Sequence, residues 1–325
     1  MLPDLLVASS RRSELRIASH DLQAAGDVFP IPEPMDALWP ASDRVLVAAK
    51  ASGGEAAVVS LRIVDRTPVL GPSVPVGQLP CALRAIGGLV FVACYSGGRV
   101  DAVEFAEGDA APVSLGAIDL EGAFPAGRRE STGRQEMSHP HDVVALDEGR
   151  RALICDLGAD RLYIVDTLRL QIIDVVVLPQ GAGPRKALIT PSGELVVVCE
   201  LDSTIRCFQF AAGRYVQTDC VPTTRGARDQ NFPGDLVATT DGVIVVANRG
   251  NGTLAGFAVE DGHLRNLFEE SCGGAWPASL DLRDAVVVVA NEHSGSVEVF
   301  RVSPSGLAPI ARAPWEAPSL VRFAP

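Results

Sequence analysis

Ionisable side chains recur at two kinds of position in this chain: shortly after a proline that opens a strand-like segment, and at the end of an apolar run. They are His141, Arg185, Lys186, Glu200 and Arg249. A histidine titrates near neutrality and is the natural general base. A glutamate can orient that imidazole or act as the base itself, and an arginine offers a planar fork of donors to a carboxylate or phosphate. A lysine adds a point charge that suits phosphate. The set predicts acid–base chemistry on a small anionic substrate.

Each of these residues also has a structural interpretation. The ring of His141, within the segment HPH, could bond a backbone carbonyl group. Arg185 and Glu200 could form an ion pair that satisfies buried charge, and Arg249 could brace the glycine-rich turn that follows it. On the residues alone, both interpretations stay open.

Several aspartates near these positions suit hydrogen bonding better than catalysis. Asp142 and Asp235 lie in proline-led segments, where we expect them to bond within or between strands. In the segment DLGADR we expect Asp156, Asp160 and Arg161 to shape the turn after their apolar run.

Seven β-branched apolar runs must position these side chains. Each is followed, after a short turn, by a second alternating run, and helical patterns are almost absent. Such a repeat, with starts about 40 to 60 residues apart, predicts an all-β, seven-bladed β-propeller with a central channel. The runs are LLVASS at 5–10, RVLVAA at 44–49, LVFVAC at 89–94, RALICD at 151–156, ELVVVC at 194–199, GVIVVA at 242–247 and AVVVVA at 285–290.

A short proline-led segment precedes most of these runs and is expected to be the inner strand of each blade. The run at Leu5 has none before it, but PSLVRF at 318–323 can supply one. We therefore expect a C-terminal strand to join the N-terminal blade and close the ring. The other segments are PMDAL at 34–38, PCAL at 80–83, PHDV at 140–143, PRKAL at 184–188, PGDL at 233–236 and PASL at 277–280.

Composition favours one large domain over residues 1–325. A net charge of −12 argues against nucleic-acid binding, and no apolar stretch is long enough to cross a bilayer. The N-terminal residues have the pattern of a strand rather than of a signal peptide. The seven cysteines lack the CxxC spacing of a zinc or redox site. We therefore expect reduced thiols, with Cys94, Cys155 and Cys199 buried, and a cytoplasmic location. Residues about 106–138 read as a long inter-blade loop that could act as a lid.

Four segments resemble the bacterial 6-phosphogluconolactonases of the seven-bladed propeller type, a family that includes the fungal carboxymuconate-lactonising enzymes. The resemblance is close in blades four to seven and weaker in blades one to three. The segments are RQEMSHPHDV at 134–143, DLGADRLYIVD at 156–166, GAGPRKALITPSGELVVVCEL at 181–201 and DGVIVVANRGNGTLAGFAV at 241–259.

Two positions depart from the family pattern. Lys186 stands where the family segment GPRH has histidine, and Ala82 stands where a histidine often follows Pro-Cys. Both changes bear on which substrate is used. The site residues that the resemblance implies are His141, Arg185, Glu200, Arg249 and Asp235.

A lactone is a cyclic ester, and opening it requires a base to deprotonate water and a group to stabilise the oxyanion. We therefore expect an enzyme that hydrolyses a sugar-acid lactone such as 6-phosphogluconolactone, without cofactor or metal. The alternatives are a carboxymuconate-type cycloisomerase and a non-catalytic propeller that binds a metabolite or protein. The expected catalytic residues are His141, Glu200, Arg185 and Arg249, and the expected substrate-binding residues are Lys186, Asp235, His139 and Arg134.

Other chemistries find little support in the sequence. His139 and His141 could chelate a metal, but no third histidine has ligand-like spacing. A GxSxG elbow, a GxxxxGK loop and a Rossmann fingerprint are absent. The tryptophans Trp39, Trp276 and Trp315 are expected to pack between blades rather than to form a stacking platform. The expected partner is a small anionic lactone or sugar phosphate, bound by a monomer or a weak homodimer.

Overall fold

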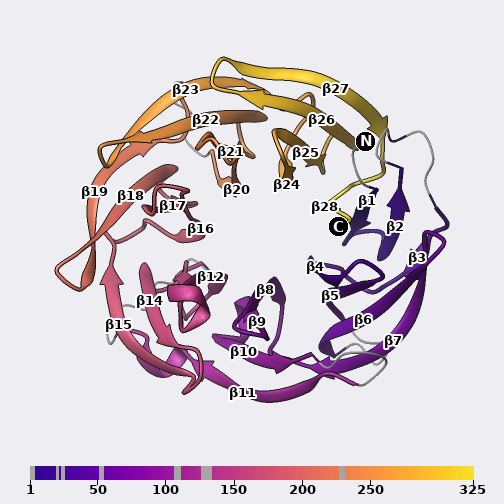
Figure 1. Cartoon of the computed structure of the whole chain (residues 1–325), viewed down its shortest axis with the longest axis horizontal. Coiled ribbons are helices and arrows are strands. Elements are labelled where there is room, and N and C mark those ends of the chain that lie inside the picture. Colours follow the sequence, from indigo (N-terminus) through magenta and orange to yellow (C-terminus); the bar gives the residue numbers. More distant parts are fainter. Residues whose placement is uncertain are drawn as a thin grey trace. The chain divides into compact units, whose positions relative to one another are not determined.

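A computed structural model describes residues 4–19, 22, 26–50, 55–105, 111–125, 134–226 and 231–325. In these residues the strands form seven four-stranded sheets (Figure 1). Helical structure among them is limited to the 3-10 turns η1 (Tyr95–Gly97), η2 (Glu121–Ala123) and η3 (Asp147–Gly149), and no helix is long and apolar enough to cross a membrane. The all-β fold with seven blades is confirmed.

Six of the sheets take four consecutive strands each. In the first half of the chain they are β4 (Asp36–Ala41), β5 (Arg44–Lys50), β6 (Ala56–Val64) and β7 (Thr67–Pro75); β8 (Pro80–Ile86), β9 (Leu89–Cys94), β10 (Arg99–Glu104) and β11 (Val113–Asp119); and β12 (Pro140–Leu146), β13 (Arg151–Asp156), β14 (Arg161–Asp166) and β15 (Gln171–Val177). In the second half they are β16 (Pro184–Ile189), β17 (Leu195–Cys199), β18 (Thr204–Ala211) and β19 (Arg214–Pro222); β20 (Pro233–Ala238), β21 (Ile244–Asn248), β22 (Thr253–Glu260) and β23 (His263–Ser271); and β24 (Pro277–Arg283), β25 (Val286–Asn291), β26 (Ser296–Ser303) and β27 (Gly306–Pro314).

The seventh sheet joins strands from the two ends of the sequence. Its order is β28 (Leu320–Phe323), β1 (Leu5–Ser9), β2 (Glu14–Ala18) and β3 (Phe29–Pro30). β28 pairs antiparallel with β1, and the Ser319 backbone N–H donates to the carbonyl oxygen of Ala8 at 2.9 Å. The Ser10 backbone N–H donates in turn to Ser319 Oγ at 2.9 Å. The expected contribution of a C-terminal strand to the N-terminal blade is confirmed.

The chain divides into two compact units. The first contains Met1–Arg12, Ala18–Ala25 and Lys186–Phe323, and the second contains Ser13–Ile17, Gly26–Arg185 and Ala324–Pro325. Each has its own apolar clusters between neighbouring sheets.

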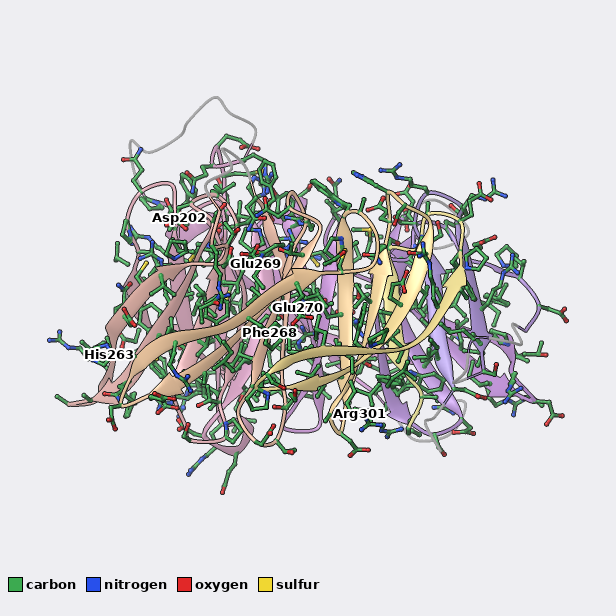
Figure 2. All side chains as sticks on the ribbon, turned by 90° about the horizontal axis from the view of Figure 1, so that it is seen from above. Asp202, His263, Phe268, Glu269, Glu270 and Arg301 are labelled. Carbon is green, nitrogen blue, oxygen red and sulfur yellow. The ribbon has the colours of Figure 1, made fainter. Side chains whose placement is uncertain are left out.

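In the first unit, the sheet β20–β23 packs on the sheet β24–β27 through a cluster that includes Phe268 and Val287. Figure 2 shows Phe268 on β23, beside Glu269 and Glu270. Phe268 is buried, and its ring lies over Gly256 of β22, where a Cβ atom would come within 2.2 Å of the ring. Glycine at this position therefore allows the outermost strand to contribute an aromatic side chain to the core.

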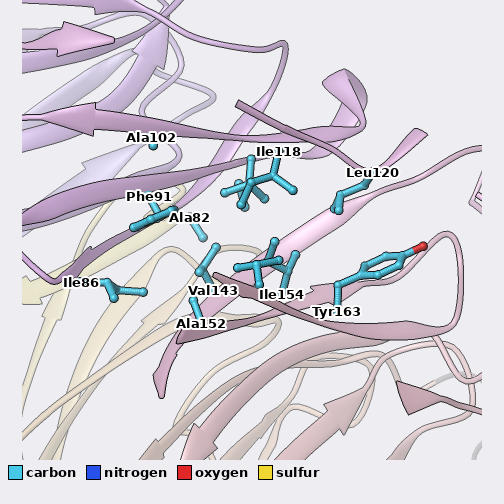
Figure 3. Close-up of a cluster of buried hydrophobic side chains, with 13 residues drawn as sticks. Ala82, Ile86, Phe91, Ala102, Ile118, Leu120, Val143, Ala152, Ile154 and Tyr163 are labelled. Atoms are coloured by element: carbon cyan, nitrogen blue, oxygen red, sulfur yellow. The ribbon is translucent and has the colours of Figure 1, made fainter. Parts of the chain in front are cut away.

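In the second unit, the sheets β8–β11 and β12–β15 share an apolar cluster (Figure 3). Phe91 and Ile118 come from one sheet, and Ile154 and Tyr163 come from the other. These side chains are almost completely buried. The alternation of apolar residues along both sheets places them on facing surfaces, so packing between blades is the main source of stability here.

Acidic residues of the inner strands tie neighbouring blades together. In the second unit, Asp36 of β4 accepts a hydrogen bond from the Leu83 backbone N–H of β8 at 2.9 Å, and Arg84 bridges Asp36 and Asp142 at 3.2 and 2.8 Å. Asp142 thus has the structural role expected from the sequence. Because backbone donors and a cation satisfy these buried carboxylates, the inner strands are held in fixed register.

The residue before the inner-strand proline usually has a left-handed backbone. Phe232 has φ +50°, Trp276 has φ +60° and Leu79 has φ +53°. A side chain in this region costs about 1–3 kcal/mol unless its surroundings hold it. The turn into these inner strands is therefore strained, and it lies beside the candidate site residues.

The segment 106–138 is only partly a loop. Residues 113–119 form β11, the outer strand of its sheet, and η2 follows at 121–123. The expectation of a continuous long loop is therefore wrong for this part. Gly116, with φ +141°, lies where the register of β10 and β11 shifts, and this irregularity hides the strand in the sequence. Residues 106–110 and 126–133, on which the expected lid depends, lie outside the described residues.

Candidate active site

An inner strand begins, and its neighbour ends, at the same edge of the sheet because the two strands are antiparallel. In β12, Pro140 lies opposite Asp156, and His141 falls in an irregularity of the pairing between Pro140 and Asp142. Cys81 occupies the equivalent place in β8. Bulges of this kind redirect the extra side chain. His141 is therefore set apart from the regular ladder at one edge of its sheet.

His141 belongs to a group of four side chains centred on Tyr95, which we name the Tyr95 cluster: Tyr95, Arg134, His139 and His141. Tyr95 follows the last residue of β9, and its ring stacks on His139 with 4.2 Å between ring centroids. The ring of His141 meets Tyr95 edge-on at 5.5 Å. Arg134 Nε donates to the phenolic oxygen at 3.2 Å. The cluster combines a cation, an aromatic surface and an imidazole.

His139 is held by protein groups on both sides of its ring. Its Nδ1 lies 2.9 Å from the Tyr95 carbonyl oxygen, and its Nε2 lies 3.2 Å from Glu136 Oε1. The side chain is 3% exposed. These contacts favour a positioning role for His139, holding Tyr95, over the direct contact with substrate that the sequence suggested.

The thiol of Cys81 lies beside the imidazole of His141. Its Sγ lies 3.8 Å from His141 Nδ1 and 3.5 Å from the carbonyl oxygen of Pro140. The thiol also faces the carbonyl oxygen of Ala93 at 3.6 Å. The S–H group of Cys81 is therefore placed to donate a hydrogen bond to carbonyl oxygens around it.

A second group of side chains lies in the first unit, and we name it the Arg249 cluster: Glu200, Phe232, Arg249, Trp276 and His293. Arg249 forms an ion pair with Glu200, 2.8 Å between its terminal nitrogen and Oε2. The two side chains are 11% and 2% exposed. Arg249 Nε donates to the Phe232 carbonyl oxygen at 2.8 Å, and the guanidinium carbon lies 5.3 Å from the Trp276 ring centre. The arginine is therefore fixed in one orientation.

Gly234 leaves the room that Arg249 occupies. A Cβ atom at Gly234 would lie 2.8 Å from Arg249 Nε and 2.9 Å from Cδ. We expect Gly234→Ala to displace the guanidinium and to lower kcat/KM, for the lactone substrate that the sequence predicts, by at least about tenfold, since misplacement of about 1 Å is costly. Steady-state kinetics will test this, with Gly226→Ala as the matched control because no atom lies within 4 Å of its Cβ position. Equal kcat/KM values for the two variants would show that the reaction does not depend on the position of the Arg249 guanidinium.

Lys186 and Asp235 form a third contact, within the first unit. Lys186 Nζ lies 3.8 Å from Asp235 Oδ1, and the Leu280 backbone N–H donates to Asp235 Oδ2 at 2.9 Å. Burial alone would raise the pKa of Asp235, but Lys186, Arg322 and backbone donors outweigh it, so the pKa is lowered. Asp235 therefore has the expected hydrogen-bonding role, and the cation at Lys186 is partly balanced before any substrate binds. Arg185 precedes Lys186 in β16 and is half-buried.

This lowered pKa predicts acid sensitivity. A carboxyl group whose folded pKa lies below its unfolded value of about 3.9 stabilises the fold above that value and loses this contribution as the pH falls through the folded pKa. We expect the stability difference between wild type and Asp235→Asn to be largest near pH 7 and to shrink below about pH 4. Urea denaturation at several pH values measures it, with the exposed Asp261→Asn as control. A difference independent of pH would contradict the assignment.

The aspartates of DLGADR are structural, as expected. Asp156 is fully buried and accepts hydrogen bonds from the hydroxyl of Ser138 and from the backbone N–H groups of His139 and Ala159. Burial raises the pKa of Asp156. Asp160 accepts from two backbone N–H groups of the loop before β16. Asp156 therefore fixes the backbone that leads into β12 and His141.

The described part of the chain contains no cluster of side chains suited to bind a metal ion. No group of three or more histidine, cysteine, aspartate or glutamate side chains there could hold an ion. All seven cysteines are free, and Cys94, Cys155 and Cys199 are buried as expected. Burial is the main reason that the pKa of Cys199 is raised, which keeps this thiol protonated.

Among the described residues, a separate hollow of about 660 Å³ lies in the second unit, and none of the expected site residues lines it. No member of the Tyr95 cluster lines it either, although Ser96, which follows Tyr95 in the chain, does. The lining residues are Glu33, Glu55, Ala56, Pro75, Val76, Gln78, Leu79 and Ser96.

Two site residues escaped the sequence analysis. Tyr95 follows an apolar run, as Glu200 does, so the shared offset could have revealed it. Trp276 was expected to pack between blades, but it stacks on His293 with 4.6 Å between centroids and lies beside Phe232 and Arg249. Its signal was its place directly before an inner-strand proline.

Comparison with known proteins shows which family this chain belongs to. A family model described as a lactonase with a seven-bladed β-propeller matches residues 12–323. The chain belongs to this lactonase family. An uncharacterized protein of Staphylococcus aureus (strain USA300) is 27% identical over 192 residues, which cover 55% of this chain and 54% of that protein. The match thus spans about half the length of this relative.

Solved structures share the fold over nearly the whole chain. A Lactobacillus plantarum protein superposes with a TM-score of 0.87 at 23% identity, covering 99% of both chains. The periplasmic gluconolactonase of Pseudomonas aeruginosa gives 0.83 at 22% identity, covering 100% of this chain and 99% of its own. A Bacteroides fragilis protein, provisionally assigned as a 6-phosphogluconolactonase, gives 0.83 at 18% identity, covering 99% and 98%. At these identities the likeness shows the propeller fold alone.

Proposed function

We propose that this protein hydrolyses a sugar-acid lactone without a metal ion, and that 6-phosphogluconolactone is its preferred substrate. The observation that supports this most is His141, displaced from its strand ladder and placed beside Tyr95 and Arg134 in a chain of the lactonase family. The cluster supplies a base and a cation in one place.

In the proposed reaction, His141 takes a proton from water, and the oxygen of that water forms a bond to the lactone carbonyl carbon. The bond between this carbon and the ring oxygen then breaks. The ring oxygen takes the proton from the imidazolium, and the product is the open hydroxy acid. Atoms and charge balance without an added oxidant or cofactor.

Cationic side chains are proposed to bind the acidic part of the substrate and to stabilise the oxyanion. Arg134 and Arg185 suit a phosphate or carboxylate, because a guanidinium can donate two parallel hydrogen bonds. Arg249, fixed by Glu200, suits the developing charge on the carbonyl oxygen, because its orientation is set before the reaction. Lys186 would assist phosphate binding as a point charge.

The test is to follow hydrolysis of freshly generated 6-phosphogluconolactone and of gluconolactone, with the spontaneous rate subtracted and with or without EDTA. We expect acceleration that survives EDTA, with a higher kcat/KM for the phosphorylated lactone. Acceleration lost with EDTA would contradict the metal-free mechanism. A higher kcat/KM for gluconolactone would contradict the proposed preference for the phosphorylated lactone. No acceleration of either lactone would overturn the proposal.

A further inference from the structure

Trp276 lies at the centre of the Arg249 cluster. Its ring is nearly parallel to the ring of His293, with 4.6 Å between centroids and 17° between planes. Phe232 contacts it at a tilt of 50°, with 6.2 Å between ring centroids. The guanidinium carbon of Arg249 lies 5.3 Å from the ring centre. The indole thus meets two aromatic rings and one cation.

The backbone around Trp276 is also fixed. Trp276 has a left-handed φ of +60°, and its carbonyl oxygen accepts a hydrogen bond from the Glu292 backbone N–H at 3.0 Å. Glu292 forms an ion pair with Arg11 at 2.7 Å, and the His293 backbone N–H donates to the Ala275 carbonyl oxygen at 3.2 Å. A strained residue persists only where its surroundings hold it. These contacts hold the indole in place.

Arg249 has many rotatable bonds, so its orientation needs several contacts. The ion pair with Glu200 and the hydrogen bond to the Phe232 carbonyl oxygen fix two parts of the guanidinium. Hydrogen bonds at the edge of a guanidinium weaken only gradually as its plane tilts. A flat aromatic face restricts that tilt further, because a guanidinium near a ring is attracted to its π surface.

We propose that Trp276 is a positioning residue for the lactonase reaction, which acts by holding the guanidinium plane of Arg249 toward the substrate oxyanion. This inference rests on the proposed function for its kinetic part. Its structural part, the immobilisation of Arg249 by the indole, stands apart from any substrate.

The structural part is tested by NMR of protein labelled with ¹⁵N-arginine, with the Arg249 Nε–H signal assigned by its loss in Arg249→Lys. In wild type we expect a signal displaced by the ring current of Trp276 and slow hydrogen exchange. In Trp276→Leu the displacement should vanish and exchange should quicken by about tenfold or more, and Trp276→Phe should keep most of both effects. An unchanged signal in Trp276→Leu would overturn the inference.

The kinetic part compares the same variants on the lactone that the wild type hydrolyses. We expect Trp276→Leu to lose about tenfold or more in kcat with little change in KM, because orientation matters most in the transition state, and Trp276→Phe to recover most of the activity. Trp315→Leu is the control, since Trp315 packs against another apolar cluster. Equal losses in the Leu and Phe variants, or a loss only in KM, would contradict the positioning role. Inactivity of the wild type would refute the proposed function while leaving the NMR result to decide the inference.

Discussion

Replacing His141 by alanine is expected to lower kcat/KM for lactone hydrolysis by about 10²- to 10⁴-fold, the usual contribution of a general base. The reason is its place at the start of β12, beside Tyr95 and out of the strand ladder. Progress curves on fresh lactone, with the spontaneous reaction subtracted, measure the loss. The melting temperature of the variant shows whether the fold is retained.

His263 provides the matched control for this prediction. It begins β23 and its side chain is 73% exposed, paired only loosely with Asp219 at 3.7 Å (Figure 2). His263→Ala should therefore keep the wild-type rate. A His141→Ala variant that retains more than about a tenth of the activity would show that another group deprotonates the water.

Replacing Arg249 by alanine is expected to lower both activity and stability. Glu200 is 2% exposed and lies 2.8 Å from Arg249, so the variant leaves a buried carboxylate without this cation. Loss of one partner of such a pair costs about 3–5 kcal/mol in free energy of unfolding. Urea denaturation measures this cost in stability. The lactone assay measures the fall in kcat/KM that follows when the cation proposed to stabilise the oxyanion is removed.

A double-mutant cycle separates the pair from its surroundings. We expect Glu200→Leu together with Arg249→Leu to be less destabilising than the sum of the single changes, because the double variant buries no lone charge. The surface pair of Arg265 and Glu260, 60% and 57% exposed, is the control and should show little coupling. Additive effects at Glu200 and Arg249 would contradict a coupled buried pair.

The sequence predicted the parts of the fold that repeat most regularly. The runs at 89–94 and 285–290 form second strands of their sheets, β9 and β25, and are buried because they lie between two other strands and two neighbouring blades. Outer strands face solvent on one side and tolerate polar residues. For this reason β11, irregular at Gly116, was not recognised.

The candidate site was only partly predictable. The ends of the strands revealed Glu200 and Arg249, which form an ion pair, and Lys186 and Asp235, which lie 3.8 Å apart. The ring contacts of His139 could not be predicted, because one of them depends on where the Tyr95 carbonyl oxygen lies in the folded chain. Contacts between residues distant in sequence are set by packing between blades, and no local pattern encodes them.

The pairing of β28 with β1 has a consequence for synthesis. The partners Ser10 and Ser319 are 309 residues apart in sequence, so β1 leaves the ribosome long before its partner exists. During that interval the edge of β1 that later pairs with β28 lacks its hydrogen-bonding partner, and an open edge invites pairing with other chains. Contacts of such long range also form slowly. Nascent chains of this protein should therefore depend on chaperones until β28 emerges.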